Sequence, residues 1–196
     1  MKPSVNEIQT VLTKKGYLFF DQNLPYNINI IGIRNKNEIA NSFDDTLCLI
    51  YRDDSLTLQL FSFPVTTDPG LYWLKNPLNV NGTAILVPGQ YKGSHQVGMH
   101  KGQYEALVQK APLKVWRDAN KDGVLNFSGI QHEGIFGINI HRSNPQTESQ
   151  SVEKWSAGCT VFKKVADFDF FMSICRKSKN LYGNSFTYTL LEEADF

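Results

Sequence analysis

Short β-type runs, separated by turn residues, place the strongest constraint on how this chain can fold. They are rich in Val, Ile, Leu, Thr and aromatic residues, and they occupy residues 28–33, 46–51, 56–63, 83–87, 113–116, 124–127 and 135–140. Breakers such as Asp53-Asp54, Asn81-Gly82 and Asp122-Gly123 recur at intervals typical of a sandwich or barrel. We therefore expect a mainly β fold of the β-sandwich or barrel-like type.

Helical periodicity is confined to the two ends of the chain. Ser4 and Glu7 have the spacing of a capping box, and apolar residues then recur at helical intervals, which predicts a helix over residues ~4–15. Residues ~165–178 place Phe168, Met172 and Cys175 on one face of a second short helix, and a strand-like SFTYTLL closes the chain. The expected architecture is a β domain with short helices near both ends.

Length and composition favour one domain over residues 1–196, in which residues 1–25 form the N-terminal helix and lead-in. The formal net charge of +1 names no nucleic-acid partner, and no apolar run is long enough to predict a membrane segment. The N-terminus carries no visible signal peptide. A substrate outside the cytoplasm would therefore require delivery by a secretion system, a phage holin or lysis.

The segment from Gly137 to Phe162 holds the residues best suited to chemistry. A β-type run ends at His141, and a polar stretch then returns the chain to Trp155-Ser-Ala-Gly-Cys159. A nearby imidazole can take the thiol proton of a cysteine and so produce the reactive thiolate. The small residues Ser156 and Gly158 leave room for substrate backbone, and the N–H groups of Gly158 and Cys159 are candidates for stabilising an oxyanion. We expect Cys159 as nucleophile and His141 as base.

A strand ending in His, followed about eighteen residues later by Ser-x-Gly-Cys-Thr, resembles the signature of the L,D-transpeptidase catalytic-domain family. The resemblance implies a cysteine that attacks a peptidoglycan stem-peptide carbonyl and forms a thioester, which is then resolved by an amine or by water. It also implies that the backbone carbonyl of Arg142 orients the imidazole of His141. No cofactor is implied.

The resemblance extends over residues ~60–165, with FPVTTDPGLYWL similar to an upstream family segment in altered form. Two positions depart from the family pattern. Arg142 stands where the family usually has Gly, and Val161 stands where the family usually has an arginine that helps hold the substrate carboxylate or the structure of the site. The departures indicate a divergent member that handles a different acyl donor, is a hydrolase or is an inactive copy. Hydrolysis is slightly preferred over transpeptidation, because transpeptidases that build a cell's own wall normally carry a signal or anchor.

Further candidates surround the pair. Trp155 can stack on substrate, and His100 can line the same cleft, although a structural role is the simpler interpretation for a histidine of this kind. Asn139 shares a strand face with His141 and is a candidate to contact substrate or to orient the base, as in other cysteine amidases. Cys48 and Cys175 are expected to be core thiols.

A calcium-loop-like spacing makes Asp118, Asn120 and Asp122 weak candidates for metal binding, but the closing acid is absent. A tight hairpin at Asp122-Gly123 is the favoured interpretation, so no metal is expected.

The predicted function is cysteine-dependent acyl transfer on peptidoglycan stem peptides, in the periplasm or cell wall, with a possible immunity or delivery protein as partner. Two alternatives remain open. One is an unrelated cysteine amidase, and the other is a catalytically inactive cell-wall-binding or interaction module that keeps the fold.

Overall fold

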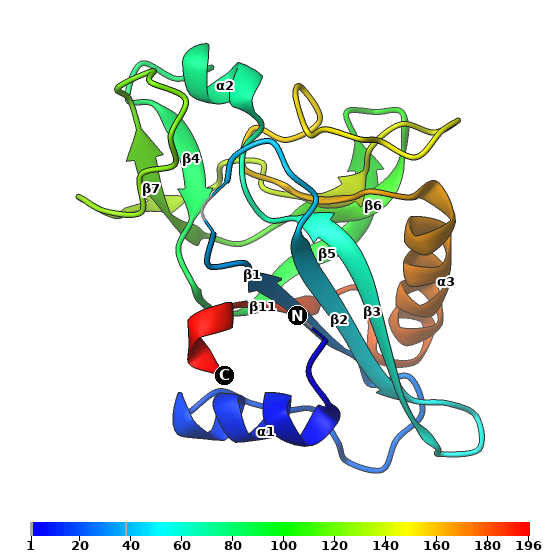
Figure 1. Cartoon of the computed structure of the whole chain (residues 1–196). Coiled ribbons are helices and arrows are strands. Elements are labelled where there is room, and N and C mark those ends of the chain that lie inside the picture. Colours follow the sequence, from blue (N-terminus) through cyan, green and yellow to red (C-terminus); the bar gives the residue numbers. More distant parts are fainter. Residues whose placement is uncertain (1, 38) are drawn as a thin grey trace.

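A closed β-barrel is the main feature of the computed structural model, which describes residues 2–37 and 39–196 (Figure 1). Neighbouring strands follow the order β1-β11-β5-β6-β9-β10-β3-β2 around it. The barrel strands are β1 (Asn29–Arg34), β2 (Asp45–Arg52), β3 (Leu58–Thr66), β5 (Gly89–His100), β6 (Tyr104–Gln109), β9 (Ile140–Arg142), β10 (Thr160–Phe162) and β11 (Phe186–Glu192). The expectation of a mainly β fold is confirmed.

A smaller sheet and a few helices complete the described chain. The sheet has the order β4-β7-β8 and lies beside the barrel, with β4 (Thr83–Leu86), β7 (Leu113–Asp118) and β8 (His132–Gly134) (Figure 1). The helices are α1 (Val5–Lys14), α2 (Leu71–Lys75), α3 (Val165–Tyr182) and the 3-10 turn η1 (Glu193–Asp195). Within residues 2–37 and 39–196, none of these helices has the length and apolar character needed to cross a lipid bilayer.

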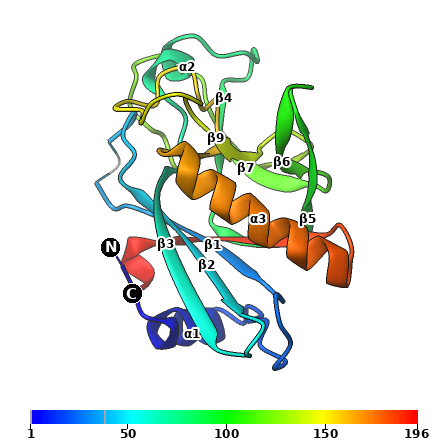
Figure 2. The same cartoon turned by 90° about the vertical axis from the view of Figure 1, so that its right-hand side faces the viewer.

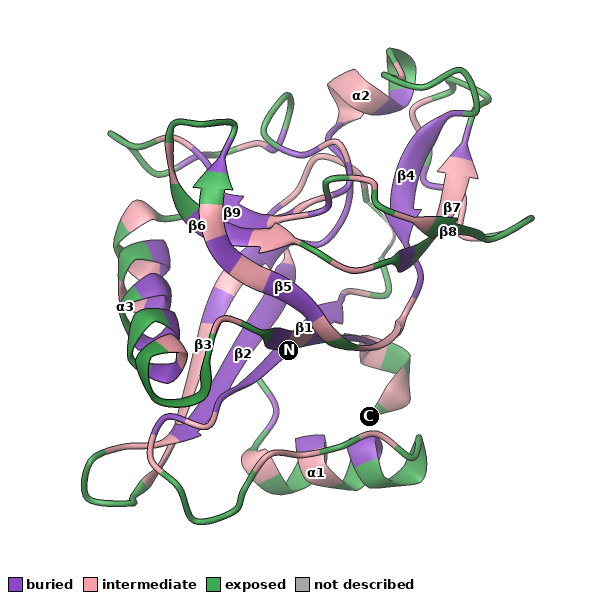
Figure 3. Ribbon diagram, turned by 180° about the vertical axis from the view of Figure 1, so that it is seen from behind, coloured by how far each residue is buried: buried purple, intermediate pink, exposed green. Residues whose placement is uncertain are grey.

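The N-terminal helix explains why β1 and β2 are apolar on both faces. Ser4 and Glu7 form the predicted capping box at the start of α1. The apolar face of α1 packs on Ile31 and Ile33, while Ile30 of the same strand points into the main core. Alternate residues of a strand face opposite sides, so covering both sides requires a continuous apolar run. Figure 3 shows β1 and β2 almost wholly buried.

The second helix, α3, begins where the periodicity predicted and continues to Tyr182, beyond the expected end at residue 178. It lies along the outside of the barrel (Figure 2) and contributes Phe168, Phe171 and Met172 to the main core. Cys175 is fully buried in the same cluster, and Cys48 is fully buried under α1. The two thiols lie in the core, as expected.

The predicted hairpin at Asp122-Gly123 is wrong. Residues 124–127 form no strand, and β7 instead pairs with β4 on one side and with β8 on the other. The Asp118 carboxylate accepts hydrogen bonds from the N–H and the side-chain amide of Asn126, both at 3.2 Å, which folds the loop back. Leu125 is buried beside Ile85. The apolar run over residues 124–127 therefore reflects packing of a loop against the small sheet and not a strand.

The strand expected over residues 135–140 is also displaced. Gly137 has φ +74°, a left-handed conformation that interrupts a strand, and only Ile140–Arg142 form β9. By contrast β5 carries few apolar residues, and neither β5 nor the short, more apolar β6 was predicted. The pairing of β5 with β11 and β6 outweighs its weak local preference.

Candidate active site

The short strand β9 delivers His141 to a pocket and sets its tautomer. The His141 Nδ1 atom lies 2.8 Å from the backbone carbonyl oxygen of Arg142. Because a carbonyl oxygen only accepts hydrogen bonds, Nδ1 carries the proton and Nε2 keeps its lone pair. The Tyr104 hydroxyl reinforces this arrangement by donating to the same carbonyl at 3.3 Å. The imidazole is thus oriented as a base, with the carbonyl contact that the family resemblance implies.

The thiol of Cys159 reaches the same pocket from the next strand. Cys159 directly precedes β10, which runs parallel to β9 with Thr160 opposite Ile140. The Thr160 hydroxyl is bonded to the buried Tyr188 hydroxyl at 2.8 Å, which anchors the residue after the thiol to the barrel interior. Parallel pairing of two short strands therefore brings together two residues that are eighteen positions apart.

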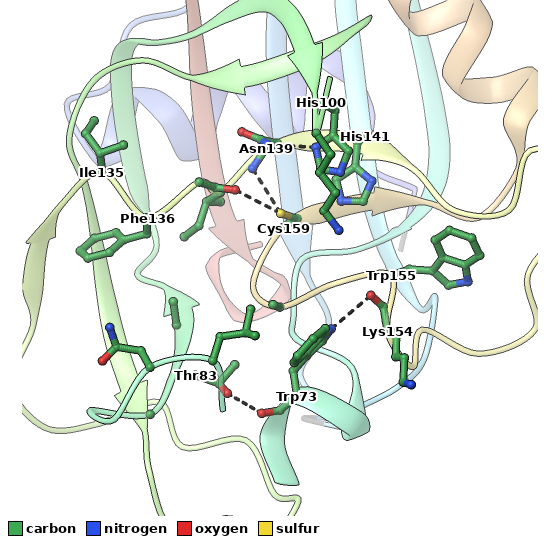
Figure 4. A pocket seen from close by; sticks show the side chains of 18 of the residues that line it. Trp73, Thr83, His100, Ile135, Phe136, Asn139, His141, Lys154, Trp155 and Cys159 are labelled. Carbon is green, nitrogen blue, oxygen red and sulfur yellow. Dashed lines mark hydrogen bonds between the residues drawn. The ribbon is translucent and has the colours of Figure 1, made fainter. Parts of the chain in front are cut away.

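The thiol has two backbone partners in the resting state. The Asn139 N–H donates to Sγ at 3.4 Å, and Sγ contacts the Gly137 carbonyl oxygen at 3.5 Å. Among the described residues no hydrogen bond joins Sγ to His141, although both side chains line one pocket and lie close together in Figure 4. Catalytic hydrogen bonds are often loose before substrate binds. The geometry is that of an unengaged thiol and imidazole side by side.

The turn before the thiol uses Ser156 and Gly158 for its own structure. Ser156 is fully buried, its hydroxyl donates to the Cys159 carbonyl at 2.8 Å, and it accepts the Gly158 N–H at 3.1 Å. Ser156 does not line the pocket, and the Gly158 N–H is already engaged. The sequence had suggested Ser156 as a substrate contact and the Gly158 N–H as an oxyanion donor. The structure instead uses both groups to hold the turn that precedes the thiol. The Cys159 N–H has no acceptor among the described residues.

We expect Gly158→Ala to disrupt this turn. Gly158 has φ +119°, and a Cβ there would collide with the Ala84 carbonyl oxygen of β4. Backbone strain and overpacking together should cost about 2–5 kcal/mol, which lowers the melting temperature by roughly 5–15 °C.

Gly137→Ala is the matched control, because Gly137 also has positive φ but a Cβ there would meet open space. Gly137→Ala should lose only about 1 kcal/mol of stability, from backbone strain alone. Thermal unfolding of both variants gives the comparison. Equal losses of stability in the two variants would mean that the close approach of Ala84 to Gly158 does not constrain the turn before Cys159.

His100 stacks on the catalytic candidate from the far end of β5. The rings of His100 and His141 are 4.1 Å apart at 20°. The Asn139 amide oxygen accepts the Gln109 N–H at 2.8 Å, so its amide nitrogen donates to His100 Nδ1 at 3.0 Å. Asn139 therefore positions His100, and the Arg142 carbonyl takes the part of orienting His141 that was considered for Asn139.

The pair is neutral at rest. Burial, followed by repulsion from His100, lowers the pKa of His141 to about 3. Burial raises the pKa of the Cys159 thiol, partly opposed by the Asn139 N–H and by the charge of Lys101. A desolvated thiol and a desolvated imidazole each avoid charge. Proton transfer between them is therefore expected when a bound substrate changes their surroundings.

The pocket has a volume of about 530 Å³, in the range of small-ligand sites. Trp155 and Trp73 line it, and the Trp73 ring nitrogen donates to the Lys154 carbonyl at 3.1 Å (Figure 4). Trp155 is 39 % exposed, in keeping with an aromatic surface open to a ligand. Sequence reasoning missed Trp73, which lies on the unpredicted helix α2.

Three cationic residues at the pocket, Lys101, Arg117 and Lys154, were also missed. They come from separate segments of the chain, and no local spacing marks them as a group. The position of the absent family arginine, Val161, is fully buried against Phe43 and Val152 and does not line the pocket. Any charge that meets substrate must come from these other cations.

The calcium-loop-like residues do not converge on a cation. Asp118 is buried and engaged by Asn126, whereas Asn120 and Asp122 are exposed and bonded to each other at 2.9 Å. Across the described residues, no group of three or more His, Cys, Asp or Glu side chains is arranged to hold a metal ion.

Comparison with known proteins found no matching protein-family model, no matching curated protein and no matching solved structure.

Proposed function

We propose that this protein is an L,D-transpeptidase-like cysteine enzyme that transfers the acyl group of peptidoglycan stem peptides through a thioester at Cys159. The observation that carries the proposal is the tautomer of His141. Its Nδ1–H is held by the Arg142 carbonyl, so the Nε2 lone pair is available in the pocket that also holds the Cys159 thiol. One oriented base beside one accessible thiol is the arrangement that nucleophilic catalysis requires.

In the first half-reaction, His141 Nε2 takes the thiol proton and Sγ attacks the amide carbonyl carbon, forming a C–S bond. The Cys159 N–H is the free local donor for the oxygen that becomes negative. Collapse breaks the C–N bond, and the imidazolium returns its proton to the departing amine. The product is a thioester and a free amine.

In the second half-reaction, water or an amine attacks the thioester carbonyl carbon. His141 Nε2 accepts the proton of the attacking group, the C–S bond breaks, and the thiolate is reprotonated. Attack by water gives a shortened stem peptide, whereas attack by an amine gives a new amide bond. The protein would act in this way in the periplasm or cell wall, after delivery by a secretion system or lysis.

Digestion of purified peptidoglycan tests the proposal. The wild-type protein is incubated with several peptidoglycan types, with and without an added D-amino acid, and the muropeptides are resolved by mass spectrometry. We expect shortened stem peptides, exchange products that contain the added amino acid, or both. An acyl adduct on the Cys159 peptide after acid quenching would identify the thioester. Unchanged muropeptides from every type, with no adduct, would contradict the proposal.

A further inference from the structure

The charges around the pocket are all of one sign. Lys101, Arg117 and Lys154 line it, and among its described lining residues there is no Asp or Glu. None of the three cations takes part in an ion pair within residues 2–37 and 39–196, where such pairs lie at other surfaces. Unpaired cations at a concave site attract anionic ligands.

Arg117 is the cation whose position is best defined. Its guanidinium carbon lies 4.9 Å from the Phe136 ring centroid, and Nη1 donates to the Gly82 carbonyl at 3.1 Å. Arg117 is half-buried on β7, opposite Ala84 of β4. Its other N–H groups have no acceptor among the described residues. The guanidinium thus lies against an aromatic ring with several N–H donors unused. Such a group is suited to bind a carboxylate through two parallel hydrogen bonds.

The pocket places this guanidinium across from the reacting groups. Phe136, against which Arg117 packs, lies on one side of Cys159, and His100 and His141 lie on the other (Figure 4). A bound acyl donor would thus have its scissile carbonyl at the thiol and a second polar group towards Arg117. The exposed side chains of Lys101 and Lys154 add positive charge at the pocket surface.

We propose that Arg117 binds a free carboxylate of the acyl donor, so that the site selects peptides with an unmodified carboxylate near the scissile amide and rejects their carboxamide forms. This inference rests on the proposed function. A carboxamide would leave the guanidinium uncompensated in the pocket and offers only one acceptor oxygen. Arg117, from the small sheet, thereby supplies the positive charge that the Val161 position lacks.

Labelling of Cys159 by matched reagents tests the inference without requiring catalysis. The anionic reagents are maleimidopropionate and the longer maleimidohexanoate, and N-ethylmaleimide is the neutral reference. Second-order rates are read at the Cys159 peptide by mass spectrometry at low salt. We expect at least one anionic reagent to react roughly 10- to 100-fold faster than the neutral reagent. A hydrogen bond to a charged group changes an affinity by a factor of this size.

Three variants assign the preference to one residue. Arg117→Gln should remove most of the preference, measured as the ratio of the anionic to the neutral rate in the same variant, and Arg117→Lys should keep part of it. Arg176→Gln, which removes an exposed α3 cation paired with Glu105, should keep the whole preference for anionic reagents. An equal rate for anionic and neutral reagents, or an unchanged preference in Arg117→Gln, would overturn the inference.

A measurement without the thiol separates this inference from the proposed function. Cys159→Ala protein is titrated calorimetrically with a stem tetrapeptide and with the same peptide carrying carboxamides. Tighter binding of the acid form, lost in the Cys159→Ala/Arg117→Gln double variant, supports carboxylate recognition even if no peptidoglycan is cleaved. Equal affinity, or no binding of either peptide, overturns it even if cleavage occurs.

Discussion

Cys159→Ala is expected to lower peptidoglycan turnover by on the order of 10⁴-fold or more, which removes all detectable products. In the proposed mechanism the Cys159 thiol forms the thioester, and no other thiol reaches the pocket, because Cys48 and Cys175 are fully buried in the core. Loss of a nucleophile removes the covalent route itself, so this change should exceed that of any other single substitution in the site. The rate of muropeptide release, measured by chromatography, gives the comparison.

His141→Gln should cost less, roughly 10²- to 10⁴-fold, because the thiol remains and only the proton acceptor is lost. Cys48→Ala is the matched control: it removes a thiol at the α1 interface and should retain wild-type activity in protein that remains folded. Circular dichroism establishes folding of each variant. If Cys159→Ala releases the same products at the wild-type rate, Cys159 is not the nucleophile.

Acidification from pH 6.5 to 4.5 should destabilise the protein by about 4 kcal/mol, a large part of the stability of an ordinary domain. Burial lowers the pKa of His95 and His100 to about 4 and that of His141 to about 3. A histidine whose pKa is lowered by folding stabilises the fold above its unfolded pKa of 6.5, and that contribution is lost as the pH falls.

The magnitude follows from proton counting. In the unfolded chain each histidine is about half protonated at pH 6.5 and almost fully protonated at pH 4.5, whereas the folded chain binds few of these protons. Integrated over the two pH units, each histidine contributes about 2 kcal/mol, giving about 6 to 7 kcal/mol for the three. Asp45 acts in the opposite direction, because burial and the neighbouring Asp68 raise its pKa. It offsets about a third of the histidine contribution, since it is one group against three.

Urea unfolding at a series of pH values measures this slope. His95→Gln should reduce the net proton uptake on unfolding by one, whatever it does to the absolute stability, because His95 is fully buried. A free energy of unfolding that stays constant between pH 6.5 and 4.5 would show that these histidines titrate normally in the fold.

Local sequence patterns correctly predicted the elements whose structure depends on residues close together in the chain. The capping box of α1, the apolar face of α3 and the two-sided apolar strands β1 and β2 follow from residues close together in sequence. By contrast β5, which carries His100, has little apolar signal, and the short strand β6, which carries Tyr104, was not predicted although it contains Ala106 and Leu107. They are strands because β11 and β9 supply hydrogen-bond partners from distant parts of the chain.

The candidate site divides in the same way. The sequence by itself determined the thiol and the imidazole, since these depend on residue type and spacing along the chain. It misplaced the strand that carries His141, which lies within β9 (Ile140–Arg142) and not at the end of a strand over residues 135–140. Only the tertiary structure decided that His100 stacks on His141 and that Arg117 reaches the pocket. Those contacts join segments from the barrel and the small sheet. The physical reason is that burial and charge depend on which distant segments meet, and no local spacing records those meetings.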